Sequence, residues 1–82
     1  MKVTVYSPPT PCVMCRTTKA RLDKFGIPYE SVVTDEETAH RFRNEGRSSY
    51  PVVVVERDGR EPRVWSGFRD TEIKKLADEL GK

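Results

Sequence analysis

Residues 3–15 have the sequence VTVYSPPTPCVMC, in which a β-branched run, a proline-rich loop and a Cys-x-x-Cys pair follow one another. The run at residues 3–6 predicts a first strand, and the prolines after it stiffen the loop that leads to Cys12. Cys12 and Cys15 are the only cysteines of the chain, and they fall where a helix is expected to begin. Two thiols at that spacing can close into a disulfide and reopen, which favours a redox site over a structural bridge.

The length and composition of the chain indicate a small globular domain. Its 82 residues make one domain, residues 1–82, with room for a modest core. Apolar residues make up 35% and charged residues 34%, but the apolar residues come in compact groups separated by turn signals, which argues against disorder. Lys and Arg outnumber Asp and Glu by 15 to 13 with both signs interspersed. The sequence has no long basic tract that could bind along a phosphate backbone, so we expect no nucleic-acid partner.

No stretch of the sequence has the pattern of a signal peptide or a membrane span. Met1-Lys2 runs directly into the first strand, and the longest apolar run, residues 52–55, is far too short to cross a bilayer. We therefore expect a cytoplasmic protein with no membrane association, and a monomer. In that reducing compartment a single pair of cysteines seldom forms a structural disulfide.

The first half of the chain predicts a β-α-β unit. After Cys12, residues of a buried face recur at helical steps, at Cys15, Thr18, Leu22 and Phe25. Gly26 supplies a left-handed stop for this helix. Residues 27–33 predict a second strand, and the short link between helix and strand requires a parallel, right-handed crossover.

Residues 34–46 predict a second helix. Thr34 and Glu37 have the spacing of a capping box, so the helix should run from about residue 35 to residue 45 and stop at Gly46. Only Ala39 and Phe42 are available for burial. We expect it to be the most exposed and least stable helix.

The next segment predicts a β-hairpin. Residues 52–56 should form a strand that is buried on both faces, because four valines in succession show no alternation. Asp58-Gly59 offers a two-residue hairpin turn. Residues 63–65 return as an edge strand, in which Pro62 is tolerated.

A last helix completes the expected fold. Asp70 is expected to cap it, and its apolar stripe consists of Ile73, Leu76, Ala77 and Leu80. The resulting order is βαβαββα, a parallel half followed by an antiparallel hairpin and a helix. This order predicts an α/β domain of the thioredoxin/glutaredoxin type, with a four-stranded mixed sheet and helices on both faces.

The expected positions of the two cysteines give them different roles. A thiol is a poor nucleophile until it ionises, and the free amide hydrogens and the dipole at a helix N-terminus favour the thiolate. Cys12 is expected at that place, and Cys15 one turn further along the same face, set deeper. Cys12 should attack a target disulfide to give a mixed disulfide, and Cys15 should then attack the Cys12 sulfur and release the reduced target.

Two other interpretations of the cysteine pair compete with a redox site. A zinc or iron-sulfur site needs about four thiolate or imidazole ligands, and this chain adds only His40, which we interpret as a solvated helix residue. We therefore expect no metal within one chain, which leaves a site shared across a dimer interface as the open alternative. A structural disulfide that closes so small a loop would constrain the unfolded chain little.

Three motifs together resemble those of the NrdH-redoxins, small glutaredoxin-like proteins with thioredoxin-like activity. They are Cys-x-x-Cys opening the first helix, Tyr50-Pro51 opening the third strand, and the string Trp65-Ser66-Gly67-Phe68-Arg69 before the last helix. The resemblance covers nearly the whole chain. It implies a protein that supplies electrons to a class Ib ribonucleotide reductase and recovers them from NADPH through thioredoxin reductase. FAD and NADPH would then act in the partner reductase, and this chain would bind no cofactor.

The resemblance also implies a partner-binding surface. A cis peptide bond before Pro51 would leave backbone groups of Tyr50 free to pair with an extended target segment. Trp65, Ser66 and Phe68 would tie the last helix to the active-site loop. The full set of implied partner-binding residues is Val13, Met14, Tyr50, Pro51, Trp65, Ser66, Gly67, Phe68 and Arg69.

The chain departs from the family pattern at two places. Family members usually have glutamine before the second cysteine, where this chain has Met14, a flexible apolar residue. They also commonly continue the Trp-Ser-Gly-Phe-Arg string with Pro-Asp, whereas Asp70 follows Arg69 directly here. The start of the last helix is therefore expected to differ.

Two other functions compete with this interpretation. A glutathione-dependent glutaredoxin would have a Gly-Gly motif and then acidic residues at the cap of the last helix; Arg69 should instead repel the glutathione ammonium, although Asp70 keeps this alternative open. The other is a non-catalytic binding module. Its basic patch would consist of Arg41, Arg43 and Arg47 on or next to the second helix, which a solvated helix face explains equally well.

Overall fold

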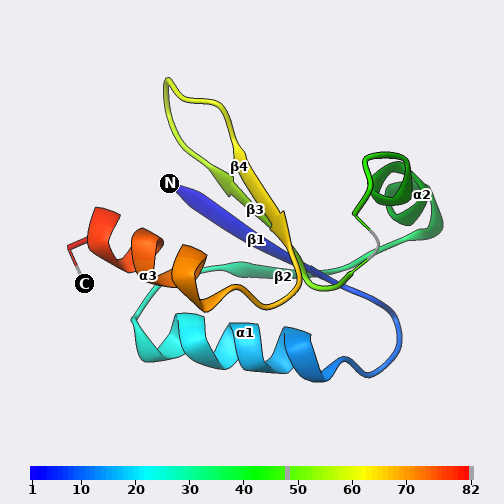
Figure 1. The fold of residues 1–82 in the computed structure, drawn as a ribbon, viewed down its shortest axis with the longest axis horizontal. Coiled ribbons are helices and arrows are strands. Elements are labelled where there is room, and N and C mark those ends of the chain that lie inside the picture. Colours follow the sequence, from blue (N-terminus) through cyan, green and yellow to red (C-terminus); the bar gives the residue numbers. More distant parts are fainter. Residues whose placement is uncertain (48, 82) are drawn as a thin grey trace.

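The computed structural model describes residues 1–47 and 49–81, which form a four-stranded mixed sheet and three helices (Figure 1). The strands are β1 (Lys2–Ser7), β2 (Glu30–Val33), β3 (Val52–Glu56) and β4 (Arg63–Ser66), and the helices are α1 (Val13–Lys24), α2 (Glu36–Asn44) and α3 (Asp70–Glu79). The predicted order βαβαββα is confirmed. None of the helices in these two described ranges is long and apolar enough to cross a membrane.

The N-terminal strand lies inside the sheet, whose order is β2-β1-β3-β4. β1 pairs in parallel with β2, which confirms the predicted β-α-β unit. β3 lies antiparallel to β1, with Val55 opposite Val3, and β4 lies antiparallel to β3, with Trp65 opposite Val53. Three of the four valines of β3 are fully buried and Val54 is half-buried, close to the prediction. β2 and β4 form the two edges.

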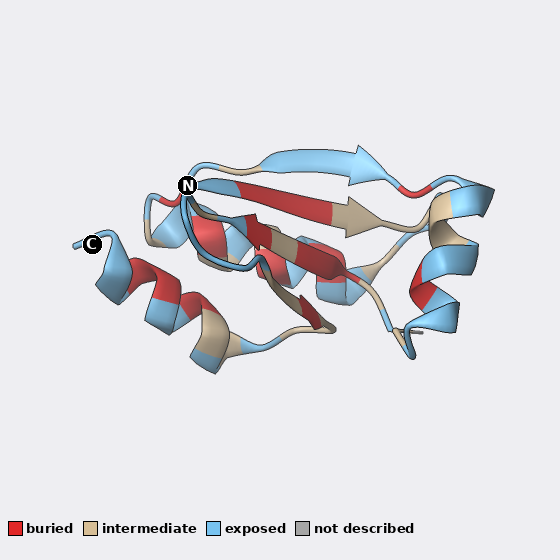
Figure 2. Ribbon diagram, turned by 90° about the horizontal axis from the view of Figure 1, so that it is seen from above, coloured by how far each residue is buried: buried red, intermediate tan, exposed pale blue. Residues whose placement is uncertain are grey.

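The hydrophobic core lies between one face of the sheet and the helices α1 and α3, as the buried segments in Figure 2 show. Strand side chains that alternate onto this face meet Leu22 of α1 and the α3 residues Ile73 and Leu76. The core consists of Val3, Val5, Leu22, Ile27, Val53, Val55, Trp65, Ile73, Leu76 and Ala77. The predicted helix stripes are confirmed except for Leu80, which stays 37% exposed at the end of α3.

The chain reverses after α1 at Gly26, as predicted. The φ angle of Gly26 is +67°, in the left-handed region that favours glycine. The amide of Ile27 then donates to the carbonyl of Leu22 at 2.9 Å, which satisfies one of the last carbonyls of the helix. The reversal at Gly26 brings Ile27 into the core.

α2 approaches the second face of the sheet near the strand ends (Figure 1). Phe42 is the only residue of Glu36–Asn44 that is buried, whereas Ala39 is half-buried. The ring of Phe42 meets the ring of Tyr6 edge-on, with the centroids 5.3 Å apart. Because side chains alternate along a strand, Tyr6 lies on the face opposite Val5 and the core. The prediction of a largely exposed second helix is confirmed.

The predicted cap of α2 is wrong by one residue. The N-cap is Asp35, whose Oδ1 accepts a hydrogen bond from the amide of Thr38 at 2.8 Å. Thr34 instead continues the pairing of the first two strands, since its amide donates to the carbonyl of Ser7 at 2.8 Å. The sheet therefore holds Thr34 in an extended conformation, and the helix starts after Asp35.

The second strand is shorter than predicted. It begins at Glu30 rather than at residue 27. The amide of Ile27 is already used in closing α1, and Pro28 has no N–H to give to a strand ladder. The chain therefore joins the sheet only after Tyr29.

The predicted two-residue hairpin is also wrong. A turn centred on Asp58-Gly59 is present, but pairing between β3 and β4 begins only at Val55 and Arg63. Pro62 lies outside β4 and cannot extend the ladder, because it has no N–H to donate. The connection therefore occupies residues 57–62.

Candidate active site

The Cys12–Cys15 pair lies at the start of α1. Cys12 is the N-cap residue, in an extended conformation with φ −140° and ψ 109°. Its Sγ accepts a hydrogen bond from the amide of Cys15 at 3.2 Å. The two sulfurs lie at disulfide distance, and the Cα atoms are 5.3 Å apart. The geometry therefore corresponds to the oxidised form of a redox pair.

The two sulfurs differ in accessibility. Cys12 is half-buried, whereas Cys15 is only 3% exposed because its position on the helix faces the interior. Val13 and Met14 stand between them in the sequence and are 73% and 45% exposed. Cys12 is therefore followed by two exposed apolar side chains. The order in which the two thiols react stays a prediction.

The segment before β3 is tied to the segment after β4. The Tyr50-Pro51 peptide bond is cis, and Pro51 is buried. The carbonyl of Pro51 accepts a hydrogen bond from the amide of Gly67 at 2.8 Å. Gly67 has a φ of +80°, a left-handed conformation that suits glycine at this turn. Two of the motifs that carry the resemblance thus meet in space.

Residues 65–69 fix the start of α3 to the core. Trp65 belongs to the buried core, and Phe68 is half-buried against it. Arg69 is exposed, and its Nε donates to the carbonyl of Ser66 at 3.3 Å. The two aromatic residues therefore hold the segment in place, and Arg69 presents a positive charge at its surface.

Asp70 does not cap α3, contrary to the prediction. The N-cap residue is Arg69, which makes no capping hydrogen bond through its side chain, and Asp70 is the first residue of the helix. The carboxylate of Asp70 lies 3.5 Å from Arg21 of α1 and 3.3 Å from Lys74. These partners, which lie outside the local sequence motif, draw the side chain away from the helix end. Asp70 thus joins α3 to α1.

A cavity of about 310 Å³ lies beside the cysteines. It is lined by Cys12, Cys15 and residues of the loop after β1, together with Arg16 and Lys19 of α1. Positive charge near the sulfurs favours the thiolate and attracts acidic groups of a target. Sequence analysis missed this role of Arg16 and Lys19, although each follows a cysteine by four residues, Arg16 after Cys12 and Lys19 after Cys15, which was a usable signal.

The arrangement suits thiol–disulfide exchange. Among residues 1–47 and 49–81, no three His, Cys, Asp or Glu side chains are grouped where they could hold a metal ion. His40 is exposed on α2. What the site does offer is an accessible sulfur at a helix N-terminus and a buried partner sulfur within reach of it.

Fold and site together define a dithiol oxidoreductase of the thioredoxin type. The family model of the glutaredoxins matches residues 3–60. The chain therefore belongs to the glutaredoxin family, and within it the chain is similar to the NrdH-redoxins, which confirms the resemblance inferred from the motifs.

Three solved structures illustrate the similarity. The glutaredoxin-like NrdH-redoxin from Escherichia coli, whose activity profile is thioredoxin-like, is 33% identical with a TM-score of 0.75, over 93% of this chain and 95% of that one. The thioredoxin-like protein BC3987, in a mutant form, is 28% identical with a TM-score of 0.68, over 92% and 97%. A glutaredoxin from Archaeoglobus fulgidus shares the fold at 24% identity and a TM-score of 0.63, over 92% and 84%. No curated protein sequence matches the chain.

Proposed function

We propose that the protein donates electrons to a class Ib ribonucleotide reductase and is re-reduced by NADPH through thioredoxin reductase. The observation that carries this proposal is the start of α3. Arg69 is exposed where a glutathione-binding acid would be expected, and the carboxylate of Asp70 is engaged by Arg21 and Lys74. A thioredoxin-like activity profile in the similar Escherichia coli protein supports the same conclusion.

The reaction proceeds through one mixed disulfide. The Cys12 thiolate attacks a sulfur of the target disulfide, a new S–S bond forms, and the other target sulfur leaves as a thiolate that takes up a proton. Cys15 loses its proton and attacks the Cys12 sulfur. The mixed disulfide breaks, the second target thiol is released, and the Cys12–Cys15 disulfide remains. Two electrons have passed to the target.

The cycle closes outside this chain. Reduction of the Cys12–Cys15 disulfide needs two electrons, which NADPH supplies through the FAD and the dithiol of thioredoxin reductase. The chain binds neither cofactor in this scheme. In this scheme both partners approach the same exposed surface around Val13 and Met14, and the backbone of Tyr50 before the cis bond to Pro51 would pair with them.

A glutathione-dependent glutaredoxin is the second candidate, because the glutaredoxin family model covers residues 3–60. The cations Arg16 and Lys19 beside the cysteines also suit the carboxylates of a small acidic thiol. The two candidates differ in which reductant can reopen the disulfide.

A coupled assay separates the two functions. The oxidised protein is incubated with NADPH and either thioredoxin reductase or glutathione plus glutathione reductase, and NADPH consumption is recorded. We expect efficient turnover with thioredoxin reductase and slow turnover with glutathione. Turnover with glutathione alone would overturn the proposal and leave the glutaredoxin assignment.

A further inference from the structure

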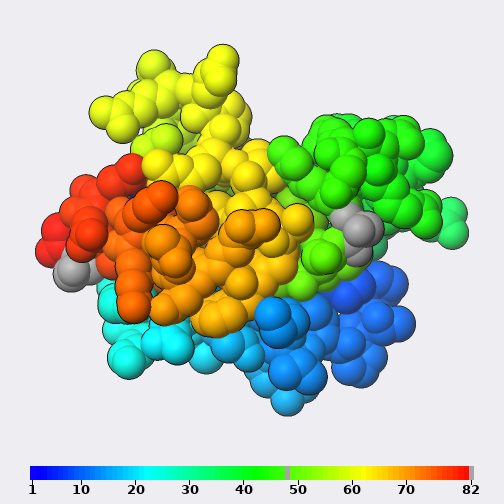
Figure 3. Space-filling view, in the orientation of Figure 1, coloured from blue at the N-terminus to red at the C-terminus, as the bar shows by residue number. Residues whose placement is uncertain are grey.

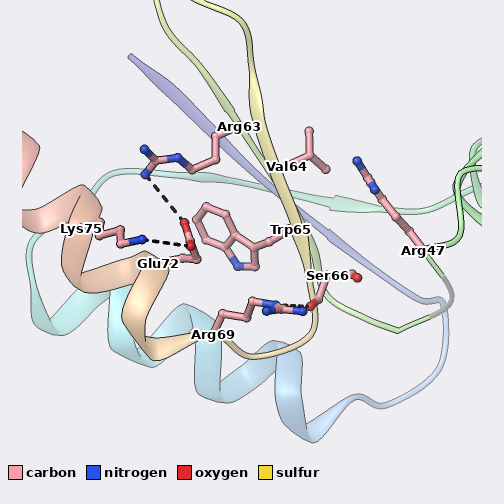
Figure 4. A pocket seen from close by; sticks show the side chains of 8 residues that line it. All are labelled: Arg47, Arg63, Val64, Trp65, Ser66, Arg69, Glu72 and Lys75. Carbon is pink, nitrogen blue, oxygen red and sulfur yellow. Dashed lines mark hydrogen bonds and ion pairs between the residues drawn. The ribbon is translucent and has the colours of Figure 1, made fainter.

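A second cavity, of about 440 Å³, lies along the outer edge of β4 (Figure 4). Its charged lining residues are Arg47, Arg63, Arg69 and Lys75, with Glu72 as the one acid. The cavity lies at the surface: in Figure 3 the gold atoms of β4 and of the loop after it are exposed between the orange atoms of α3 and the green atoms around α2. None of its lining residues takes part in the exchange between sulfurs, and Arg69 enters the proposed function only through its charge.

The cations flank the strand edge on both sides. Arg63 and Trp65 stand opposite Val55 and Val53 and so lie on the core side of the sheet, toward α3. Val64 points to the other side, where Arg47 lies (Figure 4). Among the described strands β4 pairs only with β3, so its second side is open for backbone hydrogen bonds.

The positive charge of this cavity is only partly neutralised. Glu72 is shared between Arg63, at 3.8 Å, and Lys75, at 3.6 Å. Arg69 makes no ion pair within residues 1–47 and 49–81 and donates to a backbone carbonyl. The neighbouring acid Glu79 lies 3.4 Å from Arg63. Arg47 lies 3.6 Å from Glu45, so three acids serve three of the four cations. The charge of Arg69 is the one that has no acid beside it in the described part of the chain, and it would attract a carboxylate from outside.

The cavity also contains buried donors that lack acceptors. Trp65 Nε1 is buried and finds no hydrogen-bond partner in the described part of the chain, and Figure 4 shows this nitrogen on the side of the ring nearest Arg69. Arg47 Nε and Arg63 Nη1 are likewise buried without a hydrogen bond, since the nearest carboxylate oxygens lie at 3.6 and 3.8 Å. Buried donors without partners are costly. Because these nitrogens are closed to solvent, an added acceptor reaches them only when the side chains around them shift, and it then offsets that cost.

We propose that β4 is the docking edge for an extended, acidic segment of a partner protein. The segment adds as a fifth strand, and its side chains alternate between the two sides of the sheet. Acids on one side meet Arg63, Arg69 and Lys75, and acids on the other meet Arg47. A second copy of this chain does not suit the edge, because its own β4 would bring like charges together.

This inference deepens the proposed function and rests on it for the identity of the partner. β4 leads directly into Gly67, whose amide donates to the carbonyl of Pro51, so the strand is joined to two of the motifs that the proposed function uses. In this proposal a partner whose target disulfide is attacked by Cys12 also lays an acidic segment along β4. The edge strand would then select acidic partners, and the cysteines would do the chemistry.

The test uses a cysteine-free peptide, so that its result does not depend on redox activity. Acetyl-Glu-Thr-Glu-Thr-Glu-Thr-amide is titrated into the isotope-labelled oxidised protein, and the charge-reversed peptide with Lys in place of Glu serves as the control. Trp65 is the only tryptophan, so its indole N–H gives one resolved NMR signal. We expect this signal and the amides of residues 63–66 to shift with the acidic peptide alone, and binding to weaken several-fold as salt is raised, on the order expected for exposed ion pairs.

A matched pair of variants locates the site. Arg47→Glu with Lys75→Glu should weaken binding about tenfold, since two exposed ion pairs are lost and become repulsive. Arg60→Glu with Lys24→Glu makes the same change in net charge away from the cavity and should change binding less than about twofold. Equal losses in both variants, or shifts confined to β2, would overturn the proposal.

Two further outcomes decide between interpretations. If inorganic phosphate at equal concentration produces the same shifts, the cavity binds simple anions and the strand-addition proposal fails. The salt and charge-reversal arms use the unaltered protein, so they decide the question even if a variant does not fold. A protein that binds the acidic peptide but is ignored by thioredoxin reductase would refute the proposed function and leave the edge site standing.

Discussion

Among single residues, Cys12 and Cys15 differ in a way that leads to a direct experiment. Cys12 is accessible and Cys15 is buried beneath it. Cys15→Ser should leave the attack on a target intact but block release, so mixed disulfides with target proteins should accumulate. Cys12→Ser should lose turnover and trap little. The readout is non-reducing electrophoresis after incubation with a disulfide-containing target, and equal trapping by the two variants would show that the roles are not divided in this way.

Arg69 is the residue that should discriminate against glutathione. Its charge is exposed at the start of α3, where it should repel the glutathione ammonium. Arg69→Asp replaces this repulsion by attraction and should raise the ratio of glutathione-coupled to reductase-coupled turnover about fivefold, the effect of about 1 kcal/mol at an exposed site. Arg60→Asp, in the β3–β4 connection, is the matched control. An unchanged ratio would mean that other parts of the surface exclude glutathione.

Among the elements, α2 depends on an ionised cap. The pKa of Asp35 is lowered, first by the hydrogen bond from the Thr38 side chain, then by that from the Thr38 amide, with a smaller contribution from the charge of Arg41. A carboxyl whose pKa is lower in the folded state stabilises that state above its unfolded pKa, and this contribution is lost as the pH falls through the folded value. α2 should therefore loosen in acid, below the ordinary value of 3.8.

The measurement is the NMR shift of the Thr38 amide as a function of pH. In the unaltered protein it should move through an acid transition as Asp35 takes up a proton. Asp35→Asn keeps a capping oxygen without a charge, so the transition should be absent while the helix persists. A transition of the same size in Asp35→Asn would assign the acid sensitivity to other groups.

The elements also show what sequence can and cannot predict. α1 and β3 follow from local patterns, the Leu22 stripe with its Gly26 stop and the unbroken valines. The helix caps cannot be predicted in this way. The amide of Thr34 donates to the carbonyl of Ser7 and the carboxylate of Asp70 pairs with Arg21, and only the folded chain brings these partners near.

The same distinction holds for the site. Cys12 and Cys15 could be predicted from their spacing alone. The cis bond before Pro51 could be predicted only from the family resemblance. The grouping of Arg47 and Arg69 with Arg63 and Lys75 along β4 was not predicted, because these residues come from separate elements or loops and meet only in the fold. A charge pattern along one sequence does not contain that information.

For the whole molecule, one shared core should control stability. Leu76 is fully buried where α3 packs on the sheet. Leu76→Ala should cost about 2–5 kcal/mol, a large part of the roughly 5–15 kcal/mol typical of a domain. Leu80→Ala, on the same helix but 37% exposed, should cost much less. Denaturant unfolding of both variants measures the difference, and similar losses would mean that the end of α3 is as well packed as its middle.

The hydrogen bond from the Cys15 amide to the Cys12 sulfur couples the redox cycle to the backbone of α1. The acceptor of that bond is the atom whose electron density changes at every step, from thiolate to mixed disulfide to intramolecular disulfide. The donor belongs to the backbone of the residue that must react next. Each oxidation or reduction should therefore change the strength of this hydrogen bond in the first turn of α1. The conformation of the helix N-terminus should then depend on the redox state, at the surface that partners touch.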